Sequence, residues 1–149
     1  MKQGLIALAL AALSSTALAA SLPEVISYKN PSCGCCGGWA AHMRQAGFKV
    51  TEKPVEDMDA IKRRLGVPAA AASCHTATVG GYVVEGHVPA ASVKRLLAEK
   101  PKVAGIAAPG MPAGSPGMEG SAEPPYEVVS FTREGALKPY ARYIGTRQQ

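Results

Sequence analysis

Three of the four cysteines fall within one short stretch of the chain, Ser32-Cys33-Gly34-Cys35-Cys36-Gly37-Gly38. Cys33 and Cys36 have the C-x-x-C spacing of a redox-active dithiol, and Cys35 stands inside that pair. An apolar run at 25–28 precedes the stretch, and a helix-like pattern at 39–46 follows it. A turn from a strand into a helix places the thiols at the helix N-terminus, where unpaired N–H groups and the helix dipole favour the thiolate. Because thiolates attack disulfides and bind soft metals, the stretch is suited to redox chemistry and to metal binding.

The fourth cysteine, Cys74, precedes a predicted hairpin in the phrase Ser73-Cys74-His75-Thr76. In a fold that carries a C-x-x-C turn after its first strand, the segment entering this hairpin lies beside the turn. We therefore expect Cys74 to complete a four-thiolate site. The alternative is a buried free cysteine that packs as a small hydrophobic residue. A purely structural role for the cysteines is disfavoured, because three thiols in one turn close no long loop.

The adjacency of Cys35 and Cys36 bears on which metal the site would take. Neighbouring side chains leave the backbone in different directions, which is awkward for a single tetrahedral Zn²⁺. Bridging thiolates relax this demand, and Cu(I) is a soft ion that prefers thiolate, so the pattern favours several Cu(I) ions per chain. Zinc, an iron–sulfur cluster and a metal-free dithiol remain alternatives. In the oxidised, metal-free protein we expect a disulfide between Cys33 and Cys36, because adjacent cysteines pair poorly.

Histidine and methionine side chains provide secondary candidates for metal contacts. His75 adjoins the fourth cysteine and either ligates the metal or forms a hydrogen bond nearby. Met111 and Met118 carry soft thioethers in two similar Pro-Gly-Met phrases, and they either close over copper or pack on the core. We expect His87 to cap the third helix and His42 to lie on the surface, with metal ligation as the alternative for each.

The expected elements follow from hydrophobic periodicity and turn residues. Strands are predicted at 24–28, 48–55, 76–79, 82–85, 126–131 and 137–143, and helices at 39–46, 58–65 and 89–101. Asp57 is placed to cap the second helix, Gly47 and Gly66 to end the first two, and Gly80-Gly81 to form a tight hairpin. This order predicts an α/β, thioredoxin-like fold, with a central mixed sheet flanked by helices and an added C-terminal strand pair. The Gly-, Pro- and Met-rich segment 105–125 is predicted to be a long loop.

The N-terminus has the pattern of a signal peptide. Lys2 precedes an apolar run at 5–13, and small residues lead to a cleavage site after Ala19. We expect residues 1–19 to be removed and residues 20–149 to form a single exported metal-binding domain with no membrane span. The formal net charge is +5 in a chain of 149 residues. The basic residues are scattered without an aromatic-basic patch, and those at 62–64 and 94–95 are expected on the solvated faces of predicted helices. Nucleic-acid binding is therefore not expected.

Four motifs in this order resemble the CopG-type periplasmic copper proteins: 32–37, 73–76, 81–89 and 109–119. The resemblance covers nearly all of the expected mature chain. It implies a thioredoxin-like fold and a multinuclear copper–thiolate site that serves copper resistance in the periplasm of Gram-negative bacteria. By motif match it implies that the copper ligands are Cys33, Cys35, Cys36 and Cys74, and that the partners are copper ions and other periplasmic copper-handling proteins.

Several roles remain open. The resemblance is compatible with a copper store, a copper chaperone or a copper oxidoreductase. A function of another class is a thiol–disulfide oxidoreductase that uses Cys33 and Cys36, although Cys35 would offer that pair a competing partner. A third is an exported structural domain with incidental thiols.

Overall fold

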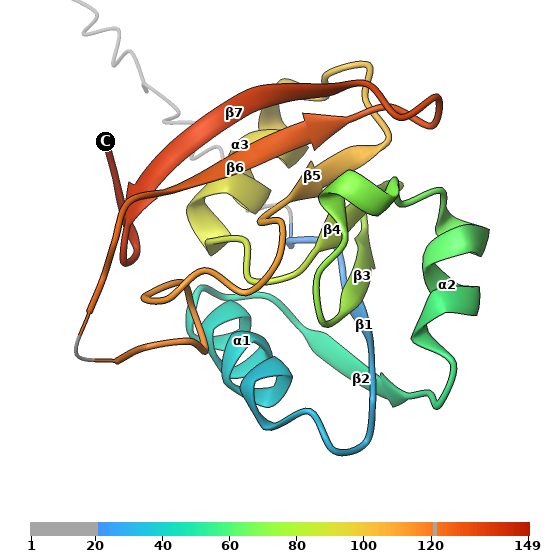
Figure 1. The fold of residues 1–149 in the computed structure, drawn as a ribbon, viewed down its shortest axis with the longest axis horizontal. Helices are drawn as coiled ribbons and strands as arrows, with labels where there is room; N and C mark the ends of the chain where they lie inside the picture. Colours follow the sequence, from blue (N-terminus) through green and yellow to red (C-terminus); the bar gives the residue numbers. More distant parts are fainter. Residues whose placement is uncertain (1–20, 121) are drawn as a thin grey trace, which may run out of the picture.

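One mixed sheet of eight strands runs through the computed structural model, which describes residues 21–120 and 122–149 (Figure 1). The strands are β1 (Val25–Lys29), β2 (Val50–Pro54), β3 (Thr76–Val79), β4 (Tyr82–Glu85), β5 (Gly105–Ala107), β6 (Tyr126–Phe131), β7 (Leu137–Ile144) and β8 (Arg147–Gln148). The helices are α1 (Gly34–Gln45), α2 (Met58–Leu65) and α3 (Ala90–Glu99), with a 3₁₀ turn, η1 (Ala69–Ala71), before β3. The predicted signal peptide, residues 1–19, lies outside the described residues.

The spatial order of the strands is β2-β1-β3-β4-β5-β6-β7-β8. The β1–β2 and β4–β5 pairs are parallel, and the other neighbours are antiparallel. α1 connects the parallel strands β1 and β2, so the Cys-rich turn lies where the first strand passes into the first helix. In the β3–β4 hairpin, Thr76 is opposite Glu85 and Val79 is opposite Tyr82.

Alternating side chains of the strands face two separate layers of helix. The larger core contains Trp39 and Met43 of α1, Leu96 of α3, and Val84 and Ile106 of the sheet. On the opposite face of the sheet, Val83 and Ala107 pack against η1 and the end of α2. The buried residues of this smaller core are Ala71, Val83, Ala107 and Phe131. Helices α1 and α3 therefore cover one face, and α2 with η1 covers the other.

Most of the predicted elements are present, with caps where the sequence indicated them. Asp57 Oδ1 accepts the Ala60 N–H at 2.9 Å at the start of α2, and Gly66 ends this helix with a φ of 71°. The hairpin turns at Gly80-Gly81 as expected. The C-terminal strand pair is present as β6 and β7, and a short β8 extends it.

Most bounds agree with the predicted ones to within one or two residues, and two expectations were wrong by more than that. Helix α1 begins at Gly34, five residues before the predicted start, so Cys35 and Cys36 are part of the helix. The segment 105–125 was predicted to be loop throughout, but its first three residues form β5, which pairs with β4 and β6. Gly105 suits this position because a Cβ there would lie 2.1 Å from Val83 O. Within the described residues, no helix is long and apolar enough to cross a membrane.

Candidate metal centre

The first turn of α1 carries three of the four cysteines. Cys33 occupies the N-cap position, and Cys35 and Cys36 follow in the helix. Cys36 is fully buried beneath the helix, whereas Cys33 and Cys35 are partly exposed. The helix dipole and the unpaired N–H groups of this turn favour negative charge on the sulfurs.

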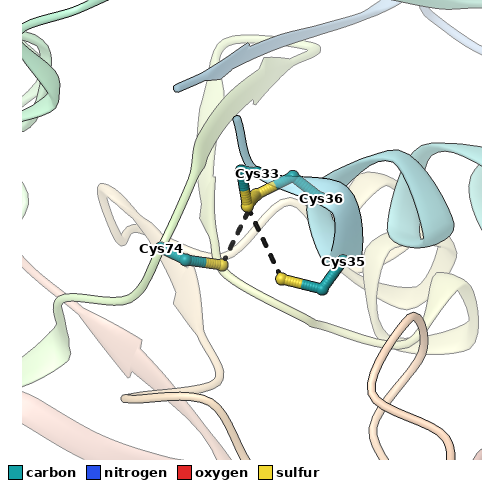
Figure 2. A group of neighbouring side chains, drawn as sticks. All are labelled: Cys33, Cys35, Cys36 and Cys74. Carbon is teal, nitrogen blue, oxygen red and sulfur yellow. Dashed lines mark hydrogen bonds between the residues drawn. A yellow bond between two sulfur atoms is a disulfide. The ribbon is translucent and has the colours of Figure 1, made fainter. Parts of the chain in front are cut away.

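The four cysteine sulfurs form one cluster (Figure 2). Cys33 and Cys36 are joined by a disulfide with their Cα atoms 5.5 Å apart, as the C-x-x-C spacing predicted. Cys35 and Cys74 are free thiols. Cys35 Sγ lies 3.5 Å from Cys33 Sγ, and Cys74 Sγ lies 3.7 Å from Cys36 Sγ. All four sulfur atoms lie within 4.8 Å of one another, although Cys74 is 38 residues from Cys36 in sequence.

The segment that carries Cys74 is held from both sides. Its Ser73 N–H donates to the buried Glu85 carboxylate at 2.6 Å, and the Thr76 hydroxyl donates to the same carboxylate at 2.6 Å. On the other side, the Gly110 N–H donates to Ala72 O at 2.9 Å, and the Ser73 hydroxyl donates to Gly110 O. The position of Cys74 is therefore set by the hydrogen bonds of the residues on either side of it, and not only by its own side chain.

Glu85 is itself paired with Lys62 of α2. The Lys62 Nζ lies 2.5 Å from Glu85 Oε1 and also donates to the Thr76 hydroxyl at 3.0 Å. The carboxylate side chain has no exposed surface, and the lysine side chain is only 12% exposed. Burial raises the pKa of Glu85, while Lys62 and the hydrogen bonds act in the opposite direction. The carboxylate thus anchors the strand that presents Cys74.

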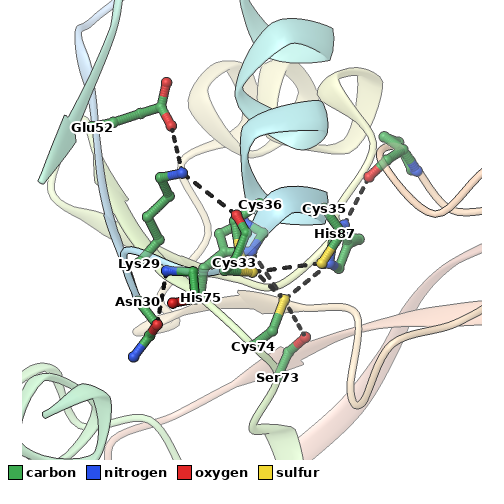
Figure 3. Close-up of a disulfide and its surroundings, with 12 residues drawn as sticks. Lys29, Asn30, Cys33, Cys35, Cys36, Glu52, Ser73, Cys74, His75 and His87 are labelled. Atoms are coloured by element: carbon green, nitrogen blue, oxygen red, sulfur yellow. Dashed lines mark hydrogen bonds and ion pairs between the residues drawn. A yellow bond between two sulfur atoms is a disulfide. The ribbon is translucent and has the colours of Figure 1, made fainter. Parts of the chain in front are cut away.

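Two histidines meet the sulfur of Cys74 (Figure 3). His87 Nε2 lies 2.9 Å from this sulfur, and His75 Nδ1 lies 3.3 Å from it. His87 Nδ1 lies 2.8 Å from Pro116 O, and because a carbonyl oxygen only accepts, the proton is on Nδ1 and the Nε2 lone pair faces the sulfur. His75 Nε2 is buried without a hydrogen-bond partner among the described residues, and its ring lies 4.6 Å from that of Trp39.

Burial governs the protonation of this group. It lowers the pKa of His75 well below the usual range, and it lowers the pKa of His87. Both imidazoles are therefore neutral near pH 7, which is the form that binds metals. Burial, together with the charge of Cys35, raises the pKa of Cys74 to about 11. A metal ion at this sulfur therefore displaces a proton.

The loop after β5 covers the start of α1. Gly117 has a φ of +85°, and a Cβ on it would lie 2.6 Å from both Cys35 O and Trp39 N. A Cβ on Gly38 would lie 2.9 Å from the Gly117 Cα. Glycine at both positions allows two backbones to touch, which brings Pro116 O to the ring of His87.

The secondary candidates lie in different places. Met111 is 56% exposed and lines a groove of about 390 Å³ that Cys74 and Lys62 also line. Met118 is partly buried in the loop that covers α1. His42 was expected on the surface, but it is half-buried and its Nε2 accepts the Ala90 N–H at 3.0 Å. His42 therefore caps α3, the role predicted for His87.

For His87 a contact at the site was only the alternative to a capping role, although a stronger signal for this contact was present. The Gly80-Gly81 turn sets the hairpin register, in which Thr76 is opposite Glu85. Continuing this register by two residues beyond the paired strands places Cys74 opposite His87. For Lys62, which was expected on a solvated helix face, the sequence contained no signal that the side chain would pair with the buried Glu85 carboxylate.

Comparisons with known proteins match both the segment that carries Cys74 and most of the chain. A family model described as "Protein of unknown function, DUF411" matches residues 71–118, the segment that carries Cys74, His75 and His87. A solved structure, "Copper resistance protein copG- Form 1", is 46% identical with a TM-score of 0.77, and the match covers 83% of this chain and 99% of that one. A second, "Copper resistance protein copG- Form 2", has the same identity of 46% and TM-score of 0.77, and the match covers 82% and 98% of the two chains. No curated protein matches the chain significantly.

Proposed function

Because the chain belongs to the family of the copper resistance protein CopG, we propose that it binds several Cu(I) ions through four thiolates. The proposed ligands are Cys33, Cys35, Cys36 and Cys74. The observation that carries this proposal is the convergence of their sulfur atoms within 4.8 Å, from two distant segments of the chain. Cu(I) is the cargo, and soft thiolates are the ligands that it prefers.

The surroundings of the sulfurs support copper binding further. His87 directs a lone pair at the Cys74 sulfur, and His75 brings a second neutral imidazole within 3.3 Å of it. Neutral imidazole is also a ligand for copper. Because the Cys33–Cys36 disulfide withholds two of the four thiolates, the full site requires a two-electron reduction before it is filled.

A titration of the purified protein tests the proposal. The protein is reduced, kept anaerobic and titrated with Cu(I) against a chromophoric Cu(I) chelator. We expect a plateau above one Cu(I) per chain, and a lower plateau for Cys74→Ser. A Ser130→Ala protein, changed on the distant strand β6, is the control. A plateau at one equivalent would leave a mononuclear site, and no binding would refute the copper function.

The scaffold and the location form part of the same proposal. The β1-α1-β2 unit with cysteines at the start of α1, followed by an antiparallel hairpin and α3, supports a thioredoxin-like assignment for residues 20–149. The N-terminal sequence pattern supports export to the periplasm with removal of residues 1–19. N-terminal sequencing of the protein from a periplasmic fraction is expected to begin at Ala20, and a start at Met1 would contradict export by cleavage.

One observation favours a second candidate function, a thiol–disulfide oxidoreductase. The Cys33–Cys36 disulfide lies at the N-terminus of a helix, the usual position of a reactive C-x-x-C pair. An insulin-reduction assay separates the two functions. Substantial reductase activity together with no uptake of Cu(I) would favour the oxidoreductase.

A further inference from the structure

The disulfide has a free thiol at each of its two ends (Figure 2). Cys74 Sγ lies 3.7 Å from Cys36 Sγ, and Cys35 Sγ lies 3.5 Å from Cys33 Sγ. Thiol–disulfide exchange begins when a thiolate sulfur meets a disulfide sulfur in this way. We propose that Cys74 exchanges with the Cys33–Cys36 disulfide, so that the oxidised protein interconverts between a Cys33–Cys36 and a Cys36–Cys74 disulfide.

The step conserves atoms and electrons. An electron pair on the Cys74 sulfur forms a bond to Cys36 Sγ, and the bond between Cys36 and Cys33 breaks. Cys33 leaves with the electron pair as a thiolate. The Cys74 thiol donates a hydrogen bond to His87 Nε2 at 2.9 Å, and its proton is released to solvent while Cys33 takes one up from solvent. One disulfide and two thiols are present before and after, so the exchange consumes no oxidant or reductant.

The surroundings of the leaving sulfur select this exchange over the other one. Attack by Cys74 releases Cys33 at the N-cap of α1, where the helix dipole stabilises a thiolate. Lys29 adds a cation at the backbone of the same residue, since its ammonium donates to Cys33 O at 3.4 Å and is paired with Glu52 at 3.3 Å. Attack by Cys35 on Cys33 would instead release Cys36, which is fully buried, and burial disfavours a thiolate.

The exchange changes which thiols the oxidised protein presents. In one isomer the free pair is Cys35 and Cys74, and Cys74 lies against two imidazoles. In the other, the free pair is Cys33 and Cys35, both partly exposed on the first turn of α1. The second isomer therefore offers an external disulfide the Cys33 thiol, which the first isomer withholds. This activity is independent of the copper cluster, which needs all four thiolates.

Tryptic cleavage makes the two isomers distinguishable. Cleavage after Lys29 and Arg44 places Cys33, Cys35 and Cys36 on one peptide, and cleavage after Arg64 and Lys94 places Cys74 on another. A Cys36–Cys74 disulfide therefore joins two peptides, and a Cys33–Cys36 disulfide joins none. The metal-free Cys35→Ser protein has one disulfide and one thiol after oxidation, so maleimide labels Cys74 in one isomer and Cys33 in the other.

The test compares two samples of oxidised, metal-free Cys35→Ser protein after removal of the oxidant. One is quenched in acid at once and then labelled, and the other is incubated with maleimide at neutral pH before the quench. We expect joined peptides with labelled Cys33 in both samples, and a severalfold larger fraction after incubation, because labelling of the exposed thiol draws molecules into that isomer. Equal fractions in the two samples, or no joined peptides above the background of Cys74→Ser, would overturn the proposal.

Wild-type protein mapped in the same way guards against a folding defect in the variant. Its joined peptides are expected to rise on incubation in the same sense, and their absence would also overturn the proposal. The Cu(I) titration of the fully reduced protein contains no disulfide to exchange. Failure of the exchange therefore leaves the copper plateau unchanged, and failure of copper binding leaves the peptide map unchanged.

Discussion

Replacing Lys62 by methionine removes the only cation that contacts the buried Glu85 carboxylate among the described residues. The side chain of Glu85 has no exposed surface, and Lys62 contributes a contact of 2.5 Å to it. The carboxylate keeps two donors, the Ser73 N–H and the Thr76 hydroxyl. Removing one partner of a buried ion pair costs about 3–5 kcal/mol. Because two donors to the carboxylate remain, we expect a loss of about 3 kcal/mol in the free energy of unfolding.

Urea denaturation near pH 7 measures this loss. Lys49→Met is the matched control, because Lys49 pairs with Glu24 at 3.3 Å and its side chain is 76% exposed. We expect the control to lose less than about 0.5 kcal/mol. A double variant, Lys62→Met with Glu85→Gln, is expected to recover about half of the single variant's loss, because no unpaired charge remains buried.

The same variant has a local readout at the site. Loss of the anchor beneath Ser73 should loosen the segment that carries Cys74, so maleimide should label Cys74 faster in the Lys62→Met protein than in the Lys49→Met protein. A loss of stability below about 1 kcal/mol, as in an exposed pair, would refute the assignment of Lys62 and Glu85 as a stabilising buried pair. An unchanged labelling rate would refute their role in positioning Cys74.

Three further outcomes are expected. Cys35→Ser should lower the Cu(I) plateau of the reduced protein and still form the Cys33–Cys36 disulfide in air; an unchanged plateau would show that Cys35 is not a ligand. Air-oxidised wild-type protein should take up little Cu(I) until a dithiol reductant is added, and rapid filling of the oxidised form would contradict a four-thiolate site. Gly117→Ala should cost about 2 kcal/mol in a urea titration, because its Cβ would lie 2.6 Å from Cys35 O. Gly120→Ala, whose Cβ would have no described residue within 4 Å, should cost less than about 0.5 kcal/mol. Equal losses from the two alanines would remove the argument for close backbone contact.

Local signals in the sequence were sufficient for those elements that depend on local physics. The cap at Asp57, the stop at Gly66 and the turn at Gly80-Gly81 depend on neighbours along the chain, and all three are present. The start of α1 was missed because Gly34 and Gly38 have low helix propensity. The helix extends there because the loop around 117 packs on its first turns, a contact that local patterns do not reveal.

For the candidate site as well, local sequence signals were sufficient for some features and contacts between distant segments decided the others. The C-x-x-C spacing indicated the disulfide, and the expected strand order brought Cys74 to the helix. His42 caps α3 in place of His87, and His87 instead contacts Cys74. Neither was the expected role, because each depends on a contact with a residue far along the chain, at 90 for His42 and at 116 for His87. The pairing of Lys62 with Glu85 joins α2 to the end of β4 in the same way, and amphipathic periodicity alone places a lysine in solvent.

The two halves of the sulfur cluster differ in how freely they can move. Cys74 follows Ser73, whose N–H is held by Glu85 and whose hydroxyl is held by Gly110, so this half is fixed from two directions. Cys33 and Cys35 lie on a partly exposed first turn, at the end of a helix where hydrogen bonds are fewest. The loop around Gly117 covers the backbone of this turn from Cys35 onward. A change in the spacing of the sulfurs, whether disulfides form or metal ions enter, therefore falls mainly on Cys33 at the N-cap.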